Sequence, residues 1–144
     1  MNIAELKSKD EFLKTYDIYK DCMYKPTPEK FELKVDTYLN DDNIKIFACI
    51  CDNNVLGVMV LSFDEGNNAE IIGIAVGKEF RNRGIGSQMI REFATCYNIN
   101  KIVAETDDDA VEFYRKTGFS VAEFSATYDT ETVTRYKCEL SFKI

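Results

Sequence analysis

The sequence predicts an α/β protein in which helices flank a central, mostly antiparallel sheet that contains one parallel pair of strands. Apolar runs rich in β-branched residues cover residues 44–51, 55–63 and 71–76, with short polar turns between them. A glycine-containing turn and a helical pattern follow the third run, before another short apolar run at 102–104. Because a helix connects these last two runs, we expect them to lie parallel, joined by a right-handed crossover.

The first forty residues are predicted to form an edge strand and two helices. Asn2–Ser8 is the expected strand. Asp10 to about Cys22 is the expected first helix, because apolar side chains recur there at near-helical intervals. The segment Lys25–Pro28 ends that helix, since neither proline can continue it. A second helix is expected next, with Pro28 in its first turn.

Two hairpins are predicted from the strand patterns. Ile44–Cys51 and Val55–Phe63 surround Asp52–Asn54, which is typical of a tight turn. Phe119–Ala126 and Val133–Phe142 form the closing pair at the end of the chain. The 144 residues show neither repeats nor linkers, so we expect a single domain with one core.

The stretch after residue 76 has the features of an anion site. Gly84 and Gly86 allow the main chain to approach a ligand without an intervening Cβ. The helix that follows begins with unpaired N–H groups and the positive end of its dipole. Arg81 and Arg83 add positive charge, which suits a phosphorylated cofactor better than a carboxylate substrate. The alternative is a glycine-rich turn that simply opens a core helix.

A second pattern lies downstream of this loop. The short strand Ile102–Ala104 runs into an acidic turn and then a helix. Asp109 is expected to be the N-cap of this helix, with Glu112 as its reciprocal partner. Gly118 is expected to end it.

Together the two patterns resemble the Gcn5-related N-acetyltransferase (GNAT) superfamily. Arg81-x-x-Gly84-x-Gly86 is similar to the acetyl-CoA signature Arg/Gln-x-x-Gly-x-Gly/Ala, in the same setting of strand, loop and helix. The superfamily's second pattern is Asn-x-x-Ala-x-x-(Phe/Leu)-Tyr-x-Lys-x-Gly-Phe. This chain departs from it only at its first position: Asp107-x-x-Ala110-x-x-Phe113-Tyr114-x-Lys116-x-Gly118-Phe119. The resemblance implies one GNAT domain over residues 1–144.

The resemblance also implies where acetyl-CoA binds. Val76, or Ala75 beside it, should offer a backbone N–H to the thioester carbonyl, because a splayed strand exposes main-chain groups. Gly73 is consistent either with a bulge that causes the splay or with tight packing. The carboxylate of Asp107 can accept a hydrogen bond but cannot donate one as the usual asparagine does. The implied cofactor-binding residues are Ile74, Ala75, Val76, Arg81, Asn82, Arg83, Gly84, Ile85, Gly86, Ser87, Asp107 and Tyr114.

Glu70 and Tyr114 are the predicted catalytic residues. An amine with a pKa near 10 is mostly protonated at neutral pH, so a base or a water path to one is needed. The chain has no histidine, which excludes histidine-based chemistry. Glu70 matches the glutamate base of histone-acetylating relatives, and Tyr114 would protonate the departing thiolate. The alternatives are an exposed strand-end carboxylate, a core tyrosine, and a water chain that ends at Glu105 or Asp107.

In the superfamily the segment after the first helix forms one wall of the substrate cleft. Four side chains there are either ordinary core or the lining of that cleft, and core is the favoured interpretation: Met23, Tyr24, Phe31 and Tyr38.

Composition narrows the expected function. The net charge of −7 argues against a nucleic-acid partner. Five cysteines without Cys-x-x-Cys spacing indicate reduced thiols in a cytoplasmic protein, and they predict neither a disulfide framework nor a metal site. No apolar run is long enough to span a membrane.

We therefore expect an N-acetyltransferase that passes the acetyl group of acetyl-CoA directly to a primary amine in a ternary complex. The acceptor is either a small molecule or a protein amine, and a homodimer is left open. The alternative is a non-catalytic CoA-binding sensor or interaction module of the same fold.

Overall fold

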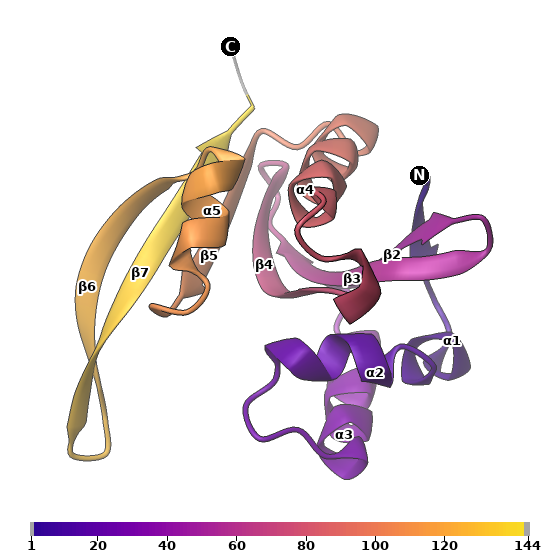
Figure 1. Cartoon of the computed structure of the whole chain (residues 1–144), viewed down its shortest axis with the longest axis horizontal. Helices are drawn as coiled ribbons and strands as arrows, with labels where there is room; N and C mark the ends of the chain where they lie inside the picture. Colours follow the sequence, from indigo (N-terminus) through magenta and orange to yellow (C-terminus); the bar gives the residue numbers. More distant parts are fainter. Residues whose placement is uncertain (1, 143–144) are drawn as a thin grey trace.

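A computed structural model describes residues 2–142 and shows a seven-stranded mixed sheet flanked by helices (Figure 1). The strand order is β1-β2-β3-β4-β5-β7-β6. Only β4 and β5 pair in parallel, so the predicted mixed sheet with one parallel pair is confirmed. The strands are β1 (Asn2–Leu6), β2 (Ile44–Cys51), β3 (Asn54–Phe63), β4 (Asn68–Val76), β5 (Lys101–Thr106), β6 (Ser120–Tyr128) and β7 (Glu131–Ser141).

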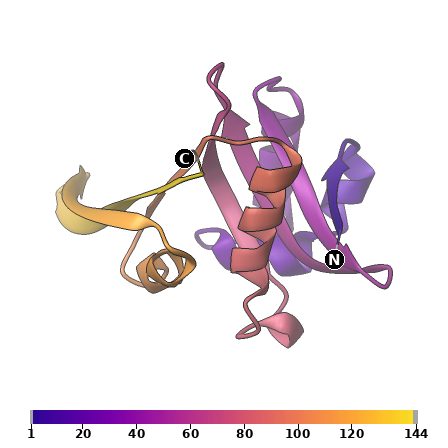
Figure 2. The same cartoon turned by 90° about the horizontal axis from the view of Figure 1, so that it is seen from above.

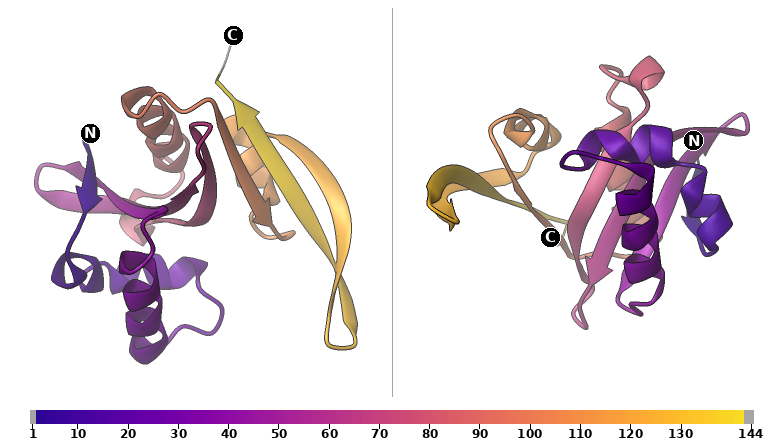
Figure 3. Two further views of the ribbon diagram at one scale, coloured as in Figure 1. Left: turned by 180° about the vertical axis from the view of Figure 1, so that it is seen from behind. Right: turned by 90° about the horizontal axis from the view of Figure 1, so that it is seen from below.

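The helices divide between the two faces of the sheet (Figures 2 and 3). One face is covered by α1 (Lys9–Leu13), α2 (Tyr16–Tyr19), the short 3-10 turn η1 (Lys20–Cys22) and α3 (Pro28–Leu39). The other face is covered by α4 (Ile85–Cys96) and α5 (Val111–Thr117), and a second 3-10 turn, η2 (Lys78–Phe80), precedes α4. Among residues 2–142, no helix combines the length and apolar character needed to cross a membrane.

Each face has its own apolar core. Phe12, Phe31 and Val35 pack with Val58 and Val60 of β3 on the α1–α3 face. The facing side of the same strand contributes Met59 and Leu61 to a second cluster, which α4 and α5 cover. The alternation along β3 produces this division, because successive side chains in a strand point to opposite faces.

The single helix predicted from Asp10 to Cys22 is wrong, because the chain forms three short helical pieces there. Ser8 caps α1 through a reciprocal bond pair with Glu11. The Oγ1 of Thr15 then donates to the Phe12 carbonyl at 2.7 Å, a local bond that competes with helix continuation. The resulting bend lets Phe12 and Tyr19 pack edge to face, with ring centroids 5.7 Å apart.

The core interpretation holds for two of the four side chains that were assigned to the core or a cleft. Phe31 and Tyr38 are buried in the core of the α1–α3 face, and Met23 packs partly buried against it. Tyr24 is 83% exposed, so it belongs to neither the core nor a closed cleft.

The β4–β5 pair is splayed, as predicted. Pairing joins Asn68–Glu70 to Lys101–Val103 and ends there, and the two ribbons then diverge (Figure 1). A register shift opposite Val60 and Leu61 leaves Ile72 without a partner on β3, which is a bulge. Gly73 beside it is also a packing requirement, because a Cβ there would lie 2.1 Å from the Tyr19 hydroxyl oxygen.

The predicted N-cap of α5 is wrong. The helix begins later, after Ala110, and has no side-chain cap bond from Asp109. Instead, Oδ1 of Asp107 accepts the N–H groups of Asp109 at 3.0 Å and Ala110 at 3.2 Å. Because Asp107 already satisfies the amides of this turn, Asp109 is not needed as a cap. Gly118 ends the helix with φ +107°, as expected.

Candidate functional site

The N-terminus of α4 has the geometry of an anion site. Gly84 is the N-cap residue with φ +74°, and no side chain caps the helix. The first intrahelical bond comes from Gln88 N–H to the Gly84 carbonyl, so the N–H groups of residues 85–87 have no helical partner. A Cβ at Gly84 would meet no atom of residues 2–142 within 4 Å, so within the protein glycine is required for the left-handed backbone.

Gly86 and Ser87 hold α5 in place next to this helix end. A Cβ on Gly86 would lie 2.7 Å from the Phe113 ring, so glycine allows the two helices to approach. The Ser87 hydroxyl lies 2.6 Å from Oγ1 of Thr117, which itself donates to the Phe113 carbonyl at 2.8 Å. The absence of a side chain at Gly86 therefore serves helix packing, a role that the sequence did not predict.

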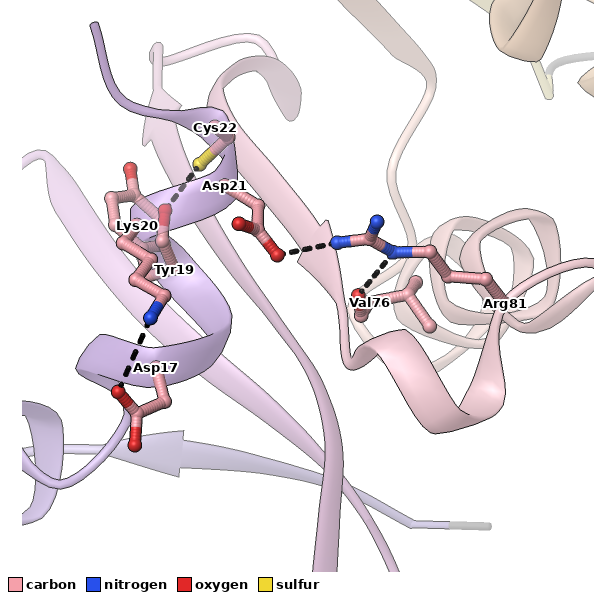
Figure 4. Close-up of polar contacts among 7 residues, drawn as sticks. All are labelled: Asp17, Tyr19, Lys20, Asp21, Cys22, Val76 and Arg81. Atoms are coloured by element: carbon pink, nitrogen blue, oxygen red, sulfur yellow. Dashed lines mark hydrogen bonds and ion pairs between the residues drawn. The ribbon is translucent and has the colours of Figure 1, made fainter. Parts of the chain in front are cut away.

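The two predicted cations of the loop differ in their surroundings, and Figure 4 shows those of Arg81. Nε of Arg81 donates to the Val76 carbonyl at 3.0 Å, and Nη2 donates to Oδ2 of Asp21 at 2.5 Å. Arg83 is exposed and forms no ion pair within residues 2–142. The charge of Arg83 is therefore free for a ligand, whereas that of Arg81 is engaged by the protein.

The second half of β4 presents main-chain groups to the gap beside β5. Gly77 N–H donates to the Leu56 carbonyl of the β3 side at 2.8 Å. Main-chain direction alternates along a strand, so the N–H groups of Val76 and Ile74 point away from β3, and that of Ala75 points toward it. Val76 is therefore the residue of the predicted pair whose N–H faces the gap.

Tyr114 is buried on the α5 face of the sheet, with 5% of its surface exposed. The rings of Phe113 and Phe119 pack edge to face against it at centroid distances of 5.0 and 5.1 Å. Burial raises the pKa of Tyr114, and the nearby thiols of Cys138 and Cys22 add to the shift. Its hydroxyl has no hydrogen-bond partner among residues 2–142 and stays protonated at neutral pH.

Cys22 is a site residue that the sequence patterns did not indicate. Its Sγ donates to the Tyr19 carbonyl at 3.2 Å, and it lies close enough to the backbone of Ile74 to interact with it. Cys22 is exposed as a residue, but the protein around its sulfur desolvates the thiol and raises its pKa to about 11, and its hydrogen bonds only partly oppose the rise. No local pattern marks Cys22, because its position depends on how η1 packs across β4.

Glu70 is exposed at the start of β4, where it pairs with Ser62 of β3 and Val103 of β5. Ser62 shares a face with Val60, so Glu70 lies on the α1–α3 face of the sheet. It lines an open groove of about 510 Å³ together with Val103 and Glu105.

Glu70 and Tyr114 therefore lie on opposite faces of the sheet, and the groove does not include Tyr114. The two faces meet where β4 and β5 diverge. Asp107 lines a separate hollow of about 520 Å³ with Arg135 and Tyr128. Within residues 2–142, no three His, Cys, Asp or Glu side chains are grouped to hold a metal ion.

Solved structures with the same fold include proteins that bind CoA. A GNAT family acetyltransferase from Elizabethkingia anophelis with acetyl-CoA bound is 20% identical, with a TM-score of 0.69 over 98% of this chain and 97% of that one. A Bacillus subtilis acetyltransferase in complex with CoA is 19% identical, with a TM-score of 0.66 over 99% of each chain. A spermidine N-acetyltransferase SpeG chimera from Vibrio cholerae and hSSAT is 14% identical, with a TM-score of 0.74 over 98% and 96%.

Residues 12–119 match the family model described as the acetyltransferase (GNAT) family, and this match covers the splayed strand, the loop before α4 and the helix that carries Tyr114. On that match, with the sheet order and the geometry of the α4 N-terminus, this chain belongs to the GNAT acetyltransferase family.

Proposed function

We propose that this chain is an N-acetyltransferase that moves the acetyl group of acetyl-CoA to a primary amine within a ternary complex. The observation that carries the proposal is the gap that opens between β4 and β5 beyond Glu70 and Val103, with Glu70 on one face of the sheet and Tyr114 on the other. Two substrates that enter from opposite faces can meet there without a covalent enzyme intermediate. The acetyl-CoA-bound relative supports the choice of donor.

The loop before α4 is the proposed pyrophosphate site. The N–H groups of residues 85–87, the loop backbone at 81–84 and the free guanidinium of Arg83 supply donors and positive charge. Acetyl-CoA supplies a thioester, whose carbonyl oxygen gains negative charge as the amine attacks. The N–H of Val76, with that of Ile74 on the same side of the strand, would stabilise that oxygen at the open edge of β4.

Tyr114 is the proposed acid. Its phenol keeps its proton at neutral pH because burial raises its pKa, and its hydroxyl has no competing partner within residues 2–142. The leaving thiolate needs one proton, and a protonated phenol near the sulfur can donate it. Asp107 supports this role indirectly, because its carboxylate fixes the turn before α5.

Glu70 is the proposed base, which takes the proton that the amine must lose before or during attack. It lies on the α1–α3 face in an open groove that Glu105, Glu139 and Lys137 also line, so the carboxylates outnumber the one lysine where a cationic amine would enter. A water chain that ends at Glu105 is the alternative route for the same proton. The acceptor is a small-molecule amine or a protein amine, and the spermidine acetyltransferase relative supports the first class.

A calorimetric titration with acetyl-CoA, followed by thiol release with a panel of amines, tests the proposal. Binding with amine-dependent thiol release is expected, and Glu70→Gln should slow release and change its pH profile. Gly84→Glu should abolish binding, because it places a negative charge beside the phosphates and a side chain at φ +74°. Gly66→Glu adds the same charge in the β3–β4 loop and is the matched control.

A CoA-binding module without turnover is the second candidate. It is favoured by the placement of Glu70 and Tyr114 on opposite faces of the sheet. Tight binding of acetyl-CoA with no thiol release from any amine would select this function. Absence of binding would overturn both candidates.

We also infer a cytoplasmic location, because all five cysteines are free thiols.

A further inference from the structure

We propose that Arg81 is a positioning residue. Its side chain ties η1, on the α1–α3 face from which the amine would enter, to the end of β4. On this view its guanidinium organises the wall of the acceptor site and is not a phosphate ligand. The inference rests on the proposed function for its effect on turnover, but its structural part stands on the contacts alone.

The guanidinium of Arg81 joins three parts of the chain. The residue itself lies in the loop before α4, one of its nitrogens donates to the last residue of β4, and another donates to Asp21 of η1 (Figure 4). Asp21 and Arg81 are 60 residues apart in sequence. One guanidinium donates from two of its nitrogens to two different acceptors in a fixed geometry. A lysine at this position cannot reproduce that geometry.

Two further contacts place the same segment against the open half of β4. The hydroxyl of Tyr19 lies over Gly73, where a Cβ would be 2.1 Å away. The thiol of Cys22 lies near the backbone of Ile74. The Arg81–Asp21 ion pair is thus the charged member of a three-point attachment between the α2–η1 segment and the open half of β4.

The ion pair also limits what Arg81 can do for a phosphate. Its charge is already balanced by the Asp21 carboxylate, and both donors described above are used within the protein. Arg83 is two residues further along and has no ion pair within residues 2–142. On this proposal Arg83 binds the phosphates, whereas Arg81 holds η1 against β4.

Loss of the ion pair should loosen η1 without removing a cofactor ligand. The amine would then be held less well against the gap, whereas acetyl-CoA would keep its loop and helix N–H groups. This predicts a higher amine KM, a smaller change in kcat and an unchanged acetyl-CoA affinity. A general loss of folding would instead change the amine KM, kcat and the acetyl-CoA affinity together.

The test compares Asp21→Asn, Arg81→Gln and the double variant with Asp17→Asn as the control. Asp17 lies in α2 and carries the same charge. Within residues 2–142 its one ion pair is with Lys20, at 3.6 Å, and its side chain is 92% exposed. Hydrogen exchange of a peptide spanning residues 16–23 should speed up by about threefold or more in both single variants and the double, and not in the control. The peptide that contains α5 should not change.

Binding and kinetics complete the test. The acetyl-CoA Kd should stay within about twofold of the parent in all variants, and the amine KM should rise by about tenfold in Asp21→Asn. Unchanged exchange in residues 16–23 would overturn the proposal. So would a phosphate role for Arg81, which would weaken acetyl-CoA binding in Arg81→Gln and strengthen it in Asp21→Asn. If no amine is acetylated by the parent protein, the proposed function fails, while exchange and binding still decide the role of Arg81.

Discussion

At the scale of single residues, the environment of each group at the gap sets its chemistry. Tyr114 and Cys22 both lie near the open edge of β4, and burial raises the pKa of each. A raised pKa lets the phenol keep the proton that an acid must donate. In the thiol, a raised pKa reduces the fraction of thiolate, which is the form that acts as a nucleophile. The same physical effect therefore favours Tyr114 as an acid and disfavours Cys22 as an acetyl carrier.

Tyr114→Phe should lower kcat by about 100-fold or more, which is the usual contribution of a general acid. The acetyl-CoA Kd should change by less than about twofold, because the hydroxyl contributes little to ground-state binding. Single-turnover thiol release and calorimetry measure the two quantities. Tyr97→Phe removes a phenol from the end of α4 and is the control. Unaltered turnover in Tyr114→Phe would refute the acid role.

Cys22→Ser should keep kcat within about threefold of the parent, because a thiol with a raised pKa is a poor nucleophile near neutral pH. The rate at which iodoacetamide alkylates Cys22 should rise with pH up to an inflection at about 11. Peptide mass spectrometry follows this rate site by site. A covalent route would instead appear as acetylated Cys22 after incubation with acetyl-CoA, together with loss of turnover in the serine variant.

At the scale of elements, three glycines near the site are required for two different physical reasons. Gly84 adopts a left-handed backbone at the start of α4. Gly86 allows α4 to approach Phe113 of α5, and Gly73 allows α2 to approach β4 through Tyr19. The loop and its two flanking contacts thus depend on backbone freedom at one position and on the absence of a Cβ at two others.

Gly73→Ala should destabilise the protein by about 1–3 kcal/mol, the usual cost of overpacking. The added methyl would lie 2.1 Å from the Tyr19 hydroxyl oxygen, so α2 must shift away from the strand. Urea unfolding measures the loss. Tyr19→Phe in the same chain should restore part of the stability, because it removes the atom nearest to the new Cβ. A stability equal to that of the parent would show that α2 moves at no cost.

At the scale of the whole molecule, two apolar cores on one sheet bury tyrosines on both faces. Tyr19 belongs to the core under α1–α3, and Tyr114 belongs to the core under α4 and α5. Burial raises the pKa of both phenols, so the folded chain retains their protons at a pH where the unfolded chain has released them. The stability of the whole fold is thereby linked to alkaline pH.

The free energy of unfolding should fall as pH rises above about 10, by about 1.4 kcal/mol per pH unit for each of these two tyrosines. The sign follows because the unfolded state binds fewer protons than the folded state in this range. Below about pH 10 both states keep the protons and the contribution is complete. Urea unfolding at several pH values measures the slope. Tyr114→Phe should reduce it, whereas Tyr128→Phe, at the exposed hairpin, serves as the control.

Several parts of the fold follow from local sequence. Gly84 predicts the loop and the start of α4, and Gly118 predicts the end of α5, because each needs a positive φ that other residues rarely adopt. Asp52 and Asn53 likewise have positive φ in the β2–β3 turn that was expected there. The N-cap at Asp109 was wrong because several carboxylates compete in one acidic turn, and their order in the sequence does not say which one meets the amides.

The sequence by itself determined the mixed sheet, the anion-site geometry of the α4 N-terminus and, through two short patterns, the family. These features depend on local backbone dihedral angles and on apolar side chains that recur every few residues. Only the tertiary structure decided that Arg81 pairs with Asp21, that Cys22 lies beside β4, and that Glu70 and Tyr114 lie on opposite faces of the sheet. These contacts join segments far apart in the chain, and they depend on which faces pack together, which no local pattern specifies.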